Sequence, residues 1–221
     1  ITQVKFIDAT PIGVNVRSTV ATYCNVHDDL RKLYARTEMA KVRKLKAGDF
    51  SYNTGCLRCP TCDGTGSITL DVQFLPDVEI PCPDCHGARY AREAYTITRE
   101  GHDGELLSLP QWMAMSVDEA LVAAKLPAIR SRLQVLHDVG LGYLTLGEAT
   151  PGLSGGEAQR LKLASEMGLA HHATLFVFDE PTIGLHPLDI QTLLRVFQQL
   201  IESGATVIVI EHDLDLIRNA D

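Results

Sequence analysis

Several features common in proteins of this size are missing from the sequence. It contains no run of eighteen apolar residues, so no transmembrane helix is expected, and its first residues do not show the pattern of a secretory signal. We therefore expect a cytoplasmic protein that does not enter a membrane. No G-x-x-x-x-G-K-S/T segment occurs either, so these residues do not supply the glycine-rich loop whose lysine reaches nucleotide phosphates.

The ends and the length of the chain bear on its organisation. It opens with Ile1 rather than methionine and stops at Asp221, where a helix is expected to begin, which predicts a segment of a longer protein. Its 221 residues suffice for one large domain or two small ones, and 45% apolar residues indicate a globular chain with a substantial core. We find no internal repeat.

The charge is unevenly distributed. Residues 1–90 hold 11 basic and 10 acidic side chains, whereas residues 91–221 hold 9 and 18, giving the net charge of −8. Between residues 31 and 46 a single acid, Glu38, stands among seven basic residues: Arg31, Lys32, Arg36, Lys41, Arg43, Lys44 and Lys46. Such a run could contact nucleic-acid phosphates, but it also fits the solvated face of a helix, and both interpretations stay open.

Apolar periodicity and capping residues predict the regular elements. Residues 4–7 read as a short strand and residues 26–35 as a helix. Ser116 and Glu119 form a capping box, and an apolar stripe that includes Leu133 predicts a helix ending at Gly140. From residue 48 to 90 glycine, proline, cysteine and aspartate dominate, which predicts an inserted small module.

A helix with an exposed amino-terminal end is predicted after Ser154. Ser154 and Glu157 make a capping box, and apolar residues follow at helical spacing. The first-turn N–H groups of such a helix are unpaired, and Gly155 and Gly156 let another backbone or a phosphate approach closely. The arrangement suits an anion such as a γ-phosphate, although an ordinary capped helix has the same pattern.

Two acidic residues follow the next predicted strand. Residues 175–178 are apolar without alternation, as expected for a parallel strand covered on both faces, and Asp179 and Glu180 come directly after them. A helix from Pro187 and a strand over residues 205–210 complete a β-α-β crossover, which brings His212 to the same sheet edge. One acid there could hold Mg²⁺ and the other could polarise water. The alternatives are a solvated strand end and an ordinary surface or core histidine.

Two C-x₂-C pairs predict a zinc site. Cys59 and Cys62 form the first pair and Cys82 and Cys85 the second, at the spacing of zinc-ribbon-like sites. Glycines follow both pairs and allow the chain to turn back over a metal; they are Gly64, Gly66 and Gly87. Cys56 and Cys59 also make a C-x₂-C, but the glycine placement favours Cys62. Cys24 reads as a core thiol, and disulfides are the alternative for the other cysteines. Removing the metal is expected to unfold residues 50–90 locally.

These motifs, in this order, resemble a known class of ATPases. LSGGE at residues 153–157 is similar to the signature motif of the ABC ATPases, and LFVFDE at residues 175–180 to their Walker B motif. With a four-cysteine insertion ahead of the signature motif, the chain resembles the UvrA family over nearly its whole length. The segments that carry this resemblance are DATPIGVNVRSTVATY at 8–23, FSYN at 50–53, CPTCDGTG at 59–66, FLPDV at 74–78, residues 82–90, GLGY at 140–143, LSGGEAQRLKLA at 153–164 and DEPTIGLH at 179–186.

The resemblance implies a fold and a division of the chain. It implies an α/β, ABC-type ATPase core (P-loop NTPase-like) at residues 1–13 and 151–221. The helical insertion at 14–150 would contain the zinc module at 50–90. By this likeness the chain is the second half of the protein, entered after its phosphate-binding loop. One departure stands out, since Ala9 occupies the place of the glutamine that would reach Mg²⁺ or the attacking water.

The resemblance also implies site residues, cofactors and partners. ATP, Mg²⁺ and Zn²⁺ are the implied cofactors. Asp179 would hold Mg²⁺, Glu180 would polarise the attacking water and His212 would sense the γ-phosphate. Ser154, Gly155, Gly156 and Glu157 would face a nucleotide held by an opposing ATPase half, as in a homodimer. Damaged double-stranded DNA and a UvrB-like subunit are the implied partners, with phosphate contacts from Lys41, Arg43, Lys44, Lys46 and Arg58.

Two further functions fit the same sequence. A UvrA-like paralogue could confer resistance to DNA-binding drugs as a zinc-stabilised module that binds DNA or a partner without efficient ATP hydrolysis. The alanine at position 9 and the missing phosphate loop favour this interpretation for the segment, while Asp179, Glu180 and His212 favour an ATPase for the whole protein. A transporter ATPase would not be expected to carry the four-cysteine insertion.

Overall fold

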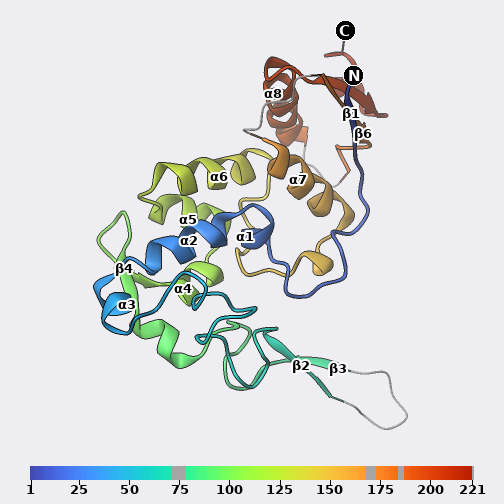
Figure 1. Cartoon of the computed structure of the whole chain (residues 1–221). Coiled ribbons are helices and arrows are strands. Elements are labelled where there is room, and N and C mark those ends of the chain that lie inside the picture. Colours follow the sequence, from blue (N-terminus) through green and yellow to red (C-terminus); the bar gives the residue numbers. More distant parts are fainter. Residues whose placement is uncertain (71–77, 168–172, 184–186, 221) are drawn as a thin grey trace.

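A small sheet, a body of helices and a projecting hairpin make up the molecule. The computed structural model describes residues 1–70, 78–167, 173–183 and 187–220. The sheet lies at one end of the molecule, the helices occupy the middle, and the hairpin points away at the opposite end (Figure 1). Residues 74–77 and 184–186, which contribute to the family resemblance, lie outside the described part.

Three parallel strands form the sheet. They are β1 (Gln3–Ile7), β6 (Thr174–Asp179) and β7 (Thr206–Ile210), in the order β1-β6-β7. The helix α8 (Pro187–Glu202) makes the crossover between β6 and β7 that parallel pairing requires. Ile7 pairs with Phe178, and Asp179 with Ile210, so the three carboxyl ends meet at one edge. The predicted α/β class is confirmed.

One face of this sheet is covered more completely than the other. Phe176 and Phe178 are fully buried, and the Phe178 ring lies 4.7 Å from the ring of Phe197 on α8. On the opposite face Phe6 is 71% and Ile210 51% exposed. On that face of β6 itself, Leu175 and Val177 are half-buried, so among the described residues the expected cover of the strand at 175–178 is complete on one face and partial on the other.

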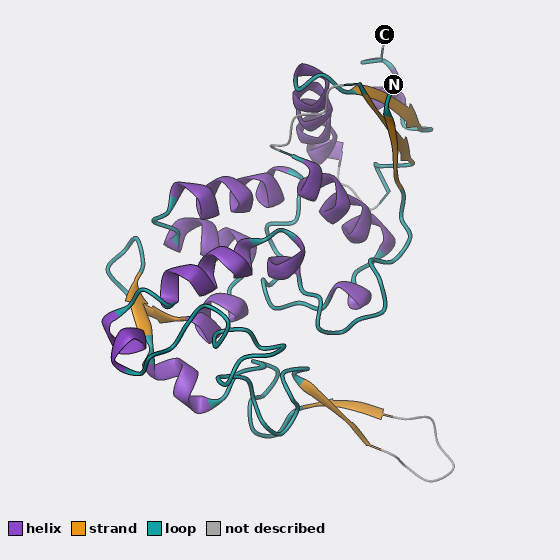
Figure 2. Cartoon of the chain, in the orientation of Figure 1, coloured by secondary structure: helices purple, strands orange, loops and turns teal. Residues whose placement is uncertain are grey.

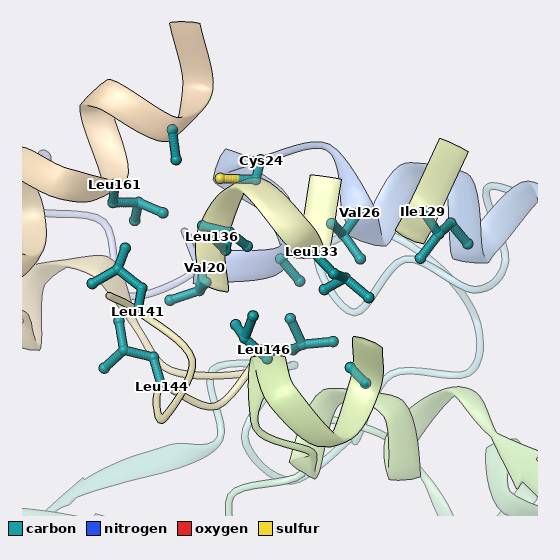
Figure 3. Close-up of a cluster of buried hydrophobic side chains, with 14 of the residues drawn as sticks. Val20, Cys24, Val26, Ile129, Leu133, Leu136, Leu141, Leu144, Leu146 and Leu161 are labelled. Atoms are coloured by element: carbon teal, nitrogen blue, oxygen red, sulfur yellow. The ribbon is translucent and has the colours of Figure 1, made fainter. Parts of the chain in front are cut away.

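The helical body encloses the largest part of the core. Its longer helices are α2 (Val26–Tyr34), α6 (Pro127–Asp138) and α7 (Gly155–Glu166). Leu133 and Leu136 of α6 are fully buried, as their spacing predicts, and Figure 3 shows them facing Val26 and the leucines of the loop after α6. Cys24 is buried in the same cluster, as predicted. Proline at the first position of α6 suits a helix start, since that N–H has no partner within the helix.

Shorter elements complete the body and the module (Figure 2). The helices are α1 (Val20–Tyr23), α3 (Glu38–Val42), α4 (Leu109–Ala114), α5 (Val117–Ala123) and α9 (Leu214–Ile217), with 3₁₀ turns η1 (Arg92–Thr96) and η2 (Thr150–Gly152). Two antiparallel hairpins pair β2 (Ser67–Leu70) with β3 (Val78–Pro81) and β4 (Thr98–Glu100) with β5 (Leu106–Ser108).

The predicted capping boxes are present. Ser154 and Glu157 cap each other reciprocally at the start of α7, and Ser116 and Glu119 do so at the start of α5. A single buried cluster runs from Ile7 through the helical body, so the core continues across the division proposed at residue 150, and that division stays a proposal. Among the described residues, no helix is long and apolar enough to span a membrane.

Candidate functional site

The carboxyl edge of the sheet gathers the predicted acidic residues and histidine. Asp179 ends β6, and Glu180 follows it with its N–H donating to the Ile210 carbonyl oxygen of β7 at 2.8 Å. His212 Nε2 lies 3.4 Å from Glu180 Oε1, and the two side chains are 86% and 41% exposed. The sheet register therefore brings Asp179 and Glu180 to the same edge as His212, more than thirty residues further along the chain, and leaves all three at least partly exposed.

Glu180 has an unusual backbone conformation. Its φ of 46° lies in the left-handed region, which non-glycine residues rarely adopt because Cβ approaches the carbonyl oxygen. The hydrogen bond of its N–H to Ile210 holds it there. Such strain is concentrated at functional sites, because the surrounding structure must be rigid enough to maintain it. Here it turns the chain sharply at the end of β6, directly after Asp179.

The start of α7 is joined to the preceding loop through Glu157. One carboxylate oxygen of Glu157 accepts the Ser154 N–H at 2.7 Å, and the other accepts the Tyr143 hydroxyl at 2.6 Å. Partial burial raises the pKa of Glu157, but these hydrogen bonds outweigh it and hold the pKa below its usual range. A charged carboxylate is also stabilised by the positive end of the helix dipole. Tyr143 thus contributes to the site, although no local pattern points to its partner.

The two glycines at the start of α7 are approached by other parts of the chain. A Cβ at Gly155 would lie 3.0 Å from the Cβ of Ala9, and one at Gly156 would lie 2.6 Å from the Ile183 carbonyl oxygen. Other parts of the backbone therefore approach both glycines closely, at Ala9 and at Ile183. Gly156 therefore packs the helix start directly against the loop that follows Glu180.

Two polar residues of α7, which sequence reasoning missed, hold the helix to the strand ends. The buried Gln159 amide donates to the carbonyl oxygens of Ile7, at 3.0 Å, and Asp179, at 2.7 Å. Lys162 Nζ lies 2.7 Å from Asp8 Oδ1, and its hydrogen bond, with that of Thr10, lowers the pKa of Asp8 to about 2. Gln159 and Lys162 lie three residues apart and so share one face of the helix, which the sequence does show, but this spacing does not identify their partners.

Four cysteines form a compact cluster at the other end of the molecule. The sulfur atoms of Cys59, Cys62, Cys82 and Cys85 all lie within 4.8 Å of one another. The Cys59–Cys82 separation is 3.8 Å and the Cys62–Cys85 separation 3.6 Å. Tetrahedral zinc with Zn–S bonds of about 2.3 Å places its sulfurs about 3.8 Å apart, so the donor set and its spacing fit zinc.

The backbone around these cysteines turns as the glycine pattern predicts. Gly64, Gly66 and Gly87 all have φ between 79° and 89°, and the Gly66 N–H donates to Cys62 Sγ at 3.3 Å. Burial raises the pKa of the Cys62 thiol, but this N–H and the neighbouring thiols bring it down to about 7, whereas burial raises the pKa of the Cys85 thiol to about 12. Cys56 is exposed, its thiol contacts Asp49, and it does not belong to the cluster.

The predicted DNA-contacting residues fall into two environments. Lys41, Arg43, Lys44 and Lys46 are exposed on α3 and the turn after it. Arg58 lies beside the first cysteine pair, where it forms an ion pair with Asp63 at 2.9 Å. Asp63 also forms an ion pair with Arg17 at 3.0 Å. A second arginine, which the sequence did not predict, therefore lies next to Arg58 beside the first cysteine pair.

Comparisons with known proteins agree with this architecture. No protein-family model matches the chain. The chain is 49% identical over 217 residues to UvrABC system protein A of Bacillus subtilis, covering 97% of the chain and 22% of that protein. It is 48% identical over 221 residues to UvrABC system protein A of Streptomyces avermitilis, covering 99% of the chain and 21% of that protein. The crystal structure of UvrA2 from Deinococcus radiodurans superimposes with a TM-score of 0.88 at 43% identity, over 98% of the chain and 26% of that structure.

The chain thus spans about a fifth of the length of the curated relatives it matches. The matches cover 97% to 99% of the chain, so they include α7 with its LSGGE motif (the signature helix), the carboxyl edge of the sheet and the cysteine cluster. Both the sequence matches and the structural match carry the same family name. The chain therefore belongs to the UvrA family.

Proposed function

We propose that the full-length protein is an ATP-dependent DNA-damage-recognition protein of nucleotide excision repair. The observation that carries this proposal is the meeting of Asp179, Glu180 and His212 at one edge of a parallel sheet, with the signature helix anchored on the same edge. Ligands of open α/β sheets bind at this edge. Because the chain spans 22% of its Bacillus relative, the activity is assigned to the longer protein.

Each residue at this edge has a role in the proposed reaction. Asp179 would hold Mg²⁺, and the ion would supply positive charge against the charge that develops on the phosphates. Glu180 would polarise the attacking water, and His212 would sense the γ-phosphate. Ser154, Gly155, Gly156 and Glu157 face the nucleotide of an opposing ATPase half, which implies a homodimer. The phosphate loop and its lysine come from outside these 221 residues.

DNA and a repair subunit are the proposed partners. Contacts from exposed lysines and arginines to DNA phosphates position a duplex without reading its sequence, which suits a protein that responds to lesions of many chemistries. We assign such contacts to Lys41, Arg43, Lys44, Lys46 and Arg58. A UvrB-like subunit would receive the damaged site, and zinc bound by the four cysteines would stabilise the module. Repair of chromosomal DNA places the protein in the cytoplasm.

Replacing Glu180 tests the ATPase assignment. In the full-length protein, Glu180→Gln is expected to lower ATP turnover by roughly 10²- to 10⁴-fold, because the water-polarising base is lost. Binding of ATP should change little, since Asp179 remains available to Mg²⁺. The matched control is Glu202→Gln, at the exposed end of α8. Full turnover in the Glu180 variant, or turnover by the 221-residue chain alone, would contradict the assignment.

Neutralising the basic residues of α3 and the turn after it tests the DNA assignment. Binding of the full-length protein to duplexes of several sequences is measured by fluorescence anisotropy over a range of salt concentrations. Replacing four residues by glutamine should weaken binding to all duplexes and make the salt slope shallower by up to about 0.9 per lost contact. The four are Lys41, Arg43, Lys44 and Lys46.

A second set of four substitutions controls for net charge. It replaces exposed basic residues far from α3 in the sequence, namely Lys125, Arg130, Arg195 and Arg218. The control set should leave the salt slope unchanged. If the two sets change the affinity and the salt slope equally, the basic residues at 41–46 form a solvated helix face and DNA is held elsewhere.

The alanine at position 9 supports a second candidate function. Ala9 packs against Gly155 at the start of the signature helix, where the family glutamine would otherwise reach the nucleotide site. This departure favours a drug-resistance paralogue that binds DNA with little ATP turnover. Ala9→Gln in the full-length protein distinguishes the two. A rise in turnover identifies the alanine as an attenuating change, whereas an already efficient wild-type enzyme excludes the second candidate.

A further inference from the structure

Glu211 lies at the centre of a hydrogen-bonded junction, and none of the roles proposed above involves it. Its Oε1 accepts the hydroxyl of Thr182 and, at 3.0 Å, the Thr182 backbone N–H. Its Oε2 accepts the backbone N–H groups of His212, at 2.6 Å, and Asp213, at 3.2 Å. One carboxylate therefore joins the loop that follows β6 to the loop that follows β7.

The two loops carry the residues expected to act on ATP. Thr182 lies two residues after Glu180, and His212 directly follows Glu211. The Glu180 N–H donates to the carbonyl oxygen of Ile210, which directly precedes Glu211. The two loops are therefore linked twice, once at Glu180 and once at Thr182. His212 is largely exposed and Glu180 is partly exposed, so packing alone does not fix their side chains, and the backbone beneath them helps to decide where they lie.

The carboxylate is well suited to this position. Partial burial raises the pKa of Glu211, but the hydrogen bonds from Thr182, His212 and Asp213 outweigh it and hold the pKa below its usual range. Hydrogen bonds to an ionised acceptor are roughly twice as strong as neutral ones. Two acceptor oxygens are required here, since donors reach the group from two different loops.

We propose that Glu211 is a positioning residue, which sets the distance between Glu180 and His212 by fixing the Thr182 loop to the His212 loop. The inference rests on the proposed ATPase function for its catalytic consequence, but the junction itself does not. Glu211 is expected to act through its backbone partners, without touching nucleotide. Its contribution should therefore appear in the rate of turnover rather than in the binding of ATP.

Glutamine at position 211 is the informative change. Its single amide oxygen can serve only one side of the junction, so the other loop loses its acceptor while side-chain volume is kept. In the full-length protein we expect Glu211→Gln to lower kcat about 10- to 100-fold, as misplacement of a reacting group does, with the KM for ATP unchanged within about twofold. The control Glu202→Gln should change neither value.

Substitutions at Thr182 test the partner. Thr182→Val removes the hydroxyl donor and should lower kcat, whereas Thr182→Ser keeps the donor and should retain wild-type turnover. Thr182→Val should add little in a protein that already carries Glu211→Gln, because both changes break the same junction. Fully additive losses, or an equal loss with serine and valine, would overturn the inference. A kcat that is unchanged in Glu211→Gln would overturn it as well.

Amide hydrogen exchange separates this inference from the proposed function. In the full-length protein, Glu211→Gln should speed exchange in the segment at 180–183, twenty-eight or more residues away in sequence, as well as at 211–213. Unchanged exchange at 180–183 would refute the junction, whatever the ATPase activity. If the wild-type protein hydrolyses no ATP, the proposed function fails, and the exchange result still decides whether Glu211 joins the loops.

Discussion

His27 is a buried side chain that links α2 to the cysteine module. Its Nε2 lies 2.7 Å from the Tyr90 hydroxyl, and that hydroxyl donates its one hydrogen to the Phe50 carbonyl oxygen. The imidazole must therefore donate from Nε2. Burial lowers the pKa of His27 to about 3, so at neutral pH the folded chain contains an uncharged histidine at this contact.

This histidine should make the fold sensitive to acid. The unfolded chain takes up a proton near pH 6.5 and the folded chain only near pH 3, so stability is full above pH 6.5 and falls as the pH drops below it, by about 1.4 kcal/mol per unit. His27→Gln retains a donor that does not titrate. Urea unfolding at pH 7.0 and 4.5 should show the wild type losing roughly 2–3 kcal/mol more than the variant. Parallel losses would mean that His27 is not neutral in the fold.

The two cysteine pairs lie between the candidate metal site on one side and the aromatic core on the other. Phe50, Tyr52 and Tyr90 flank the four cysteines and belong to the main buried cluster, whereas the cysteines form a small cluster of their own. Arg89 connects the two, since its guanidinium donates to the Gly64 carbonyl oxygen at 3.4 Å and lies over the Tyr52 ring. We therefore expect metal to stabilise the residues between Cys59 and Cys85 more than those at 50–57.

Removing a sulfur ligand tests this element. Cys59→Ser should reduce bound zinc from one ion per chain to near zero in elemental analysis, because three thiolates and a hydroxyl hold the metal far less tightly. Hydrogen exchange should then rise across residues 59–70 and 78–85, while the helical body keeps its protection. Zinc retained at one equivalent would show that these thiols do not hold it.

Cys56→Ser is the matched control. Cys56 also precedes Cys59 at C-x₂-C spacing, but its thiol is exposed and contacts Asp49. The variant should keep its zinc and its exchange pattern. If Cys56→Ser loses metal as fully as Cys59→Ser does, the metal is bound by a different set of four ligands.

Features set by neighbouring residues were predictable from the sequence. Each capping box, at Ser154 and at Ser116, forms between two residues that are three positions apart. The glycines after the cysteine pairs adopt a left-handed φ, which glycine itself allows. The parallel crossover followed from two apolar strands with a helix between them, and it placed His212 beside Glu180 correctly. Each of these predictions depends on a short local pattern or on the regular geometry of one β-α-β unit.

Contacts between distant residues were not predictable in the same way. No short sequence pattern predicts three of the hydrogen-bonded pairs described above. They are Gln159 with Ile7, Tyr143 with Glu157, and Glu211 with Thr182. The exposed face of the sheet was also missed, because an apolar run without alternation does not reveal how much protein covers each side. Such features depend on tertiary packing, which no local rule encodes.

At the scale of the whole molecule, the sheet and the cysteine module lie at opposite ends of the helical body (Figure 1). The helix α7 joins the sheet through Gln159 and Lys162, and it packs against α1 and α6 of the body. Within these residues, the helical body is thus the structural link between the basic residues proposed to contact DNA and the sheet edge proposed to bind nucleotide. The continuous buried cluster makes a mechanical connection between the two ends possible.

The open face of the sheet has a practical consequence for handling the chain. Within the described residues β1 and β7 are the outer strands, and the side chains of Val4, Phe6, Ile208 and Ile210 are about half or more exposed. Apolar surface beside unpaired strand edges is a template for self-association. Preparations of these 221 residues should therefore be kept dilute. We expect self-association to occur through the exposed end of the sheet and to be unaffected by chelators or added zinc.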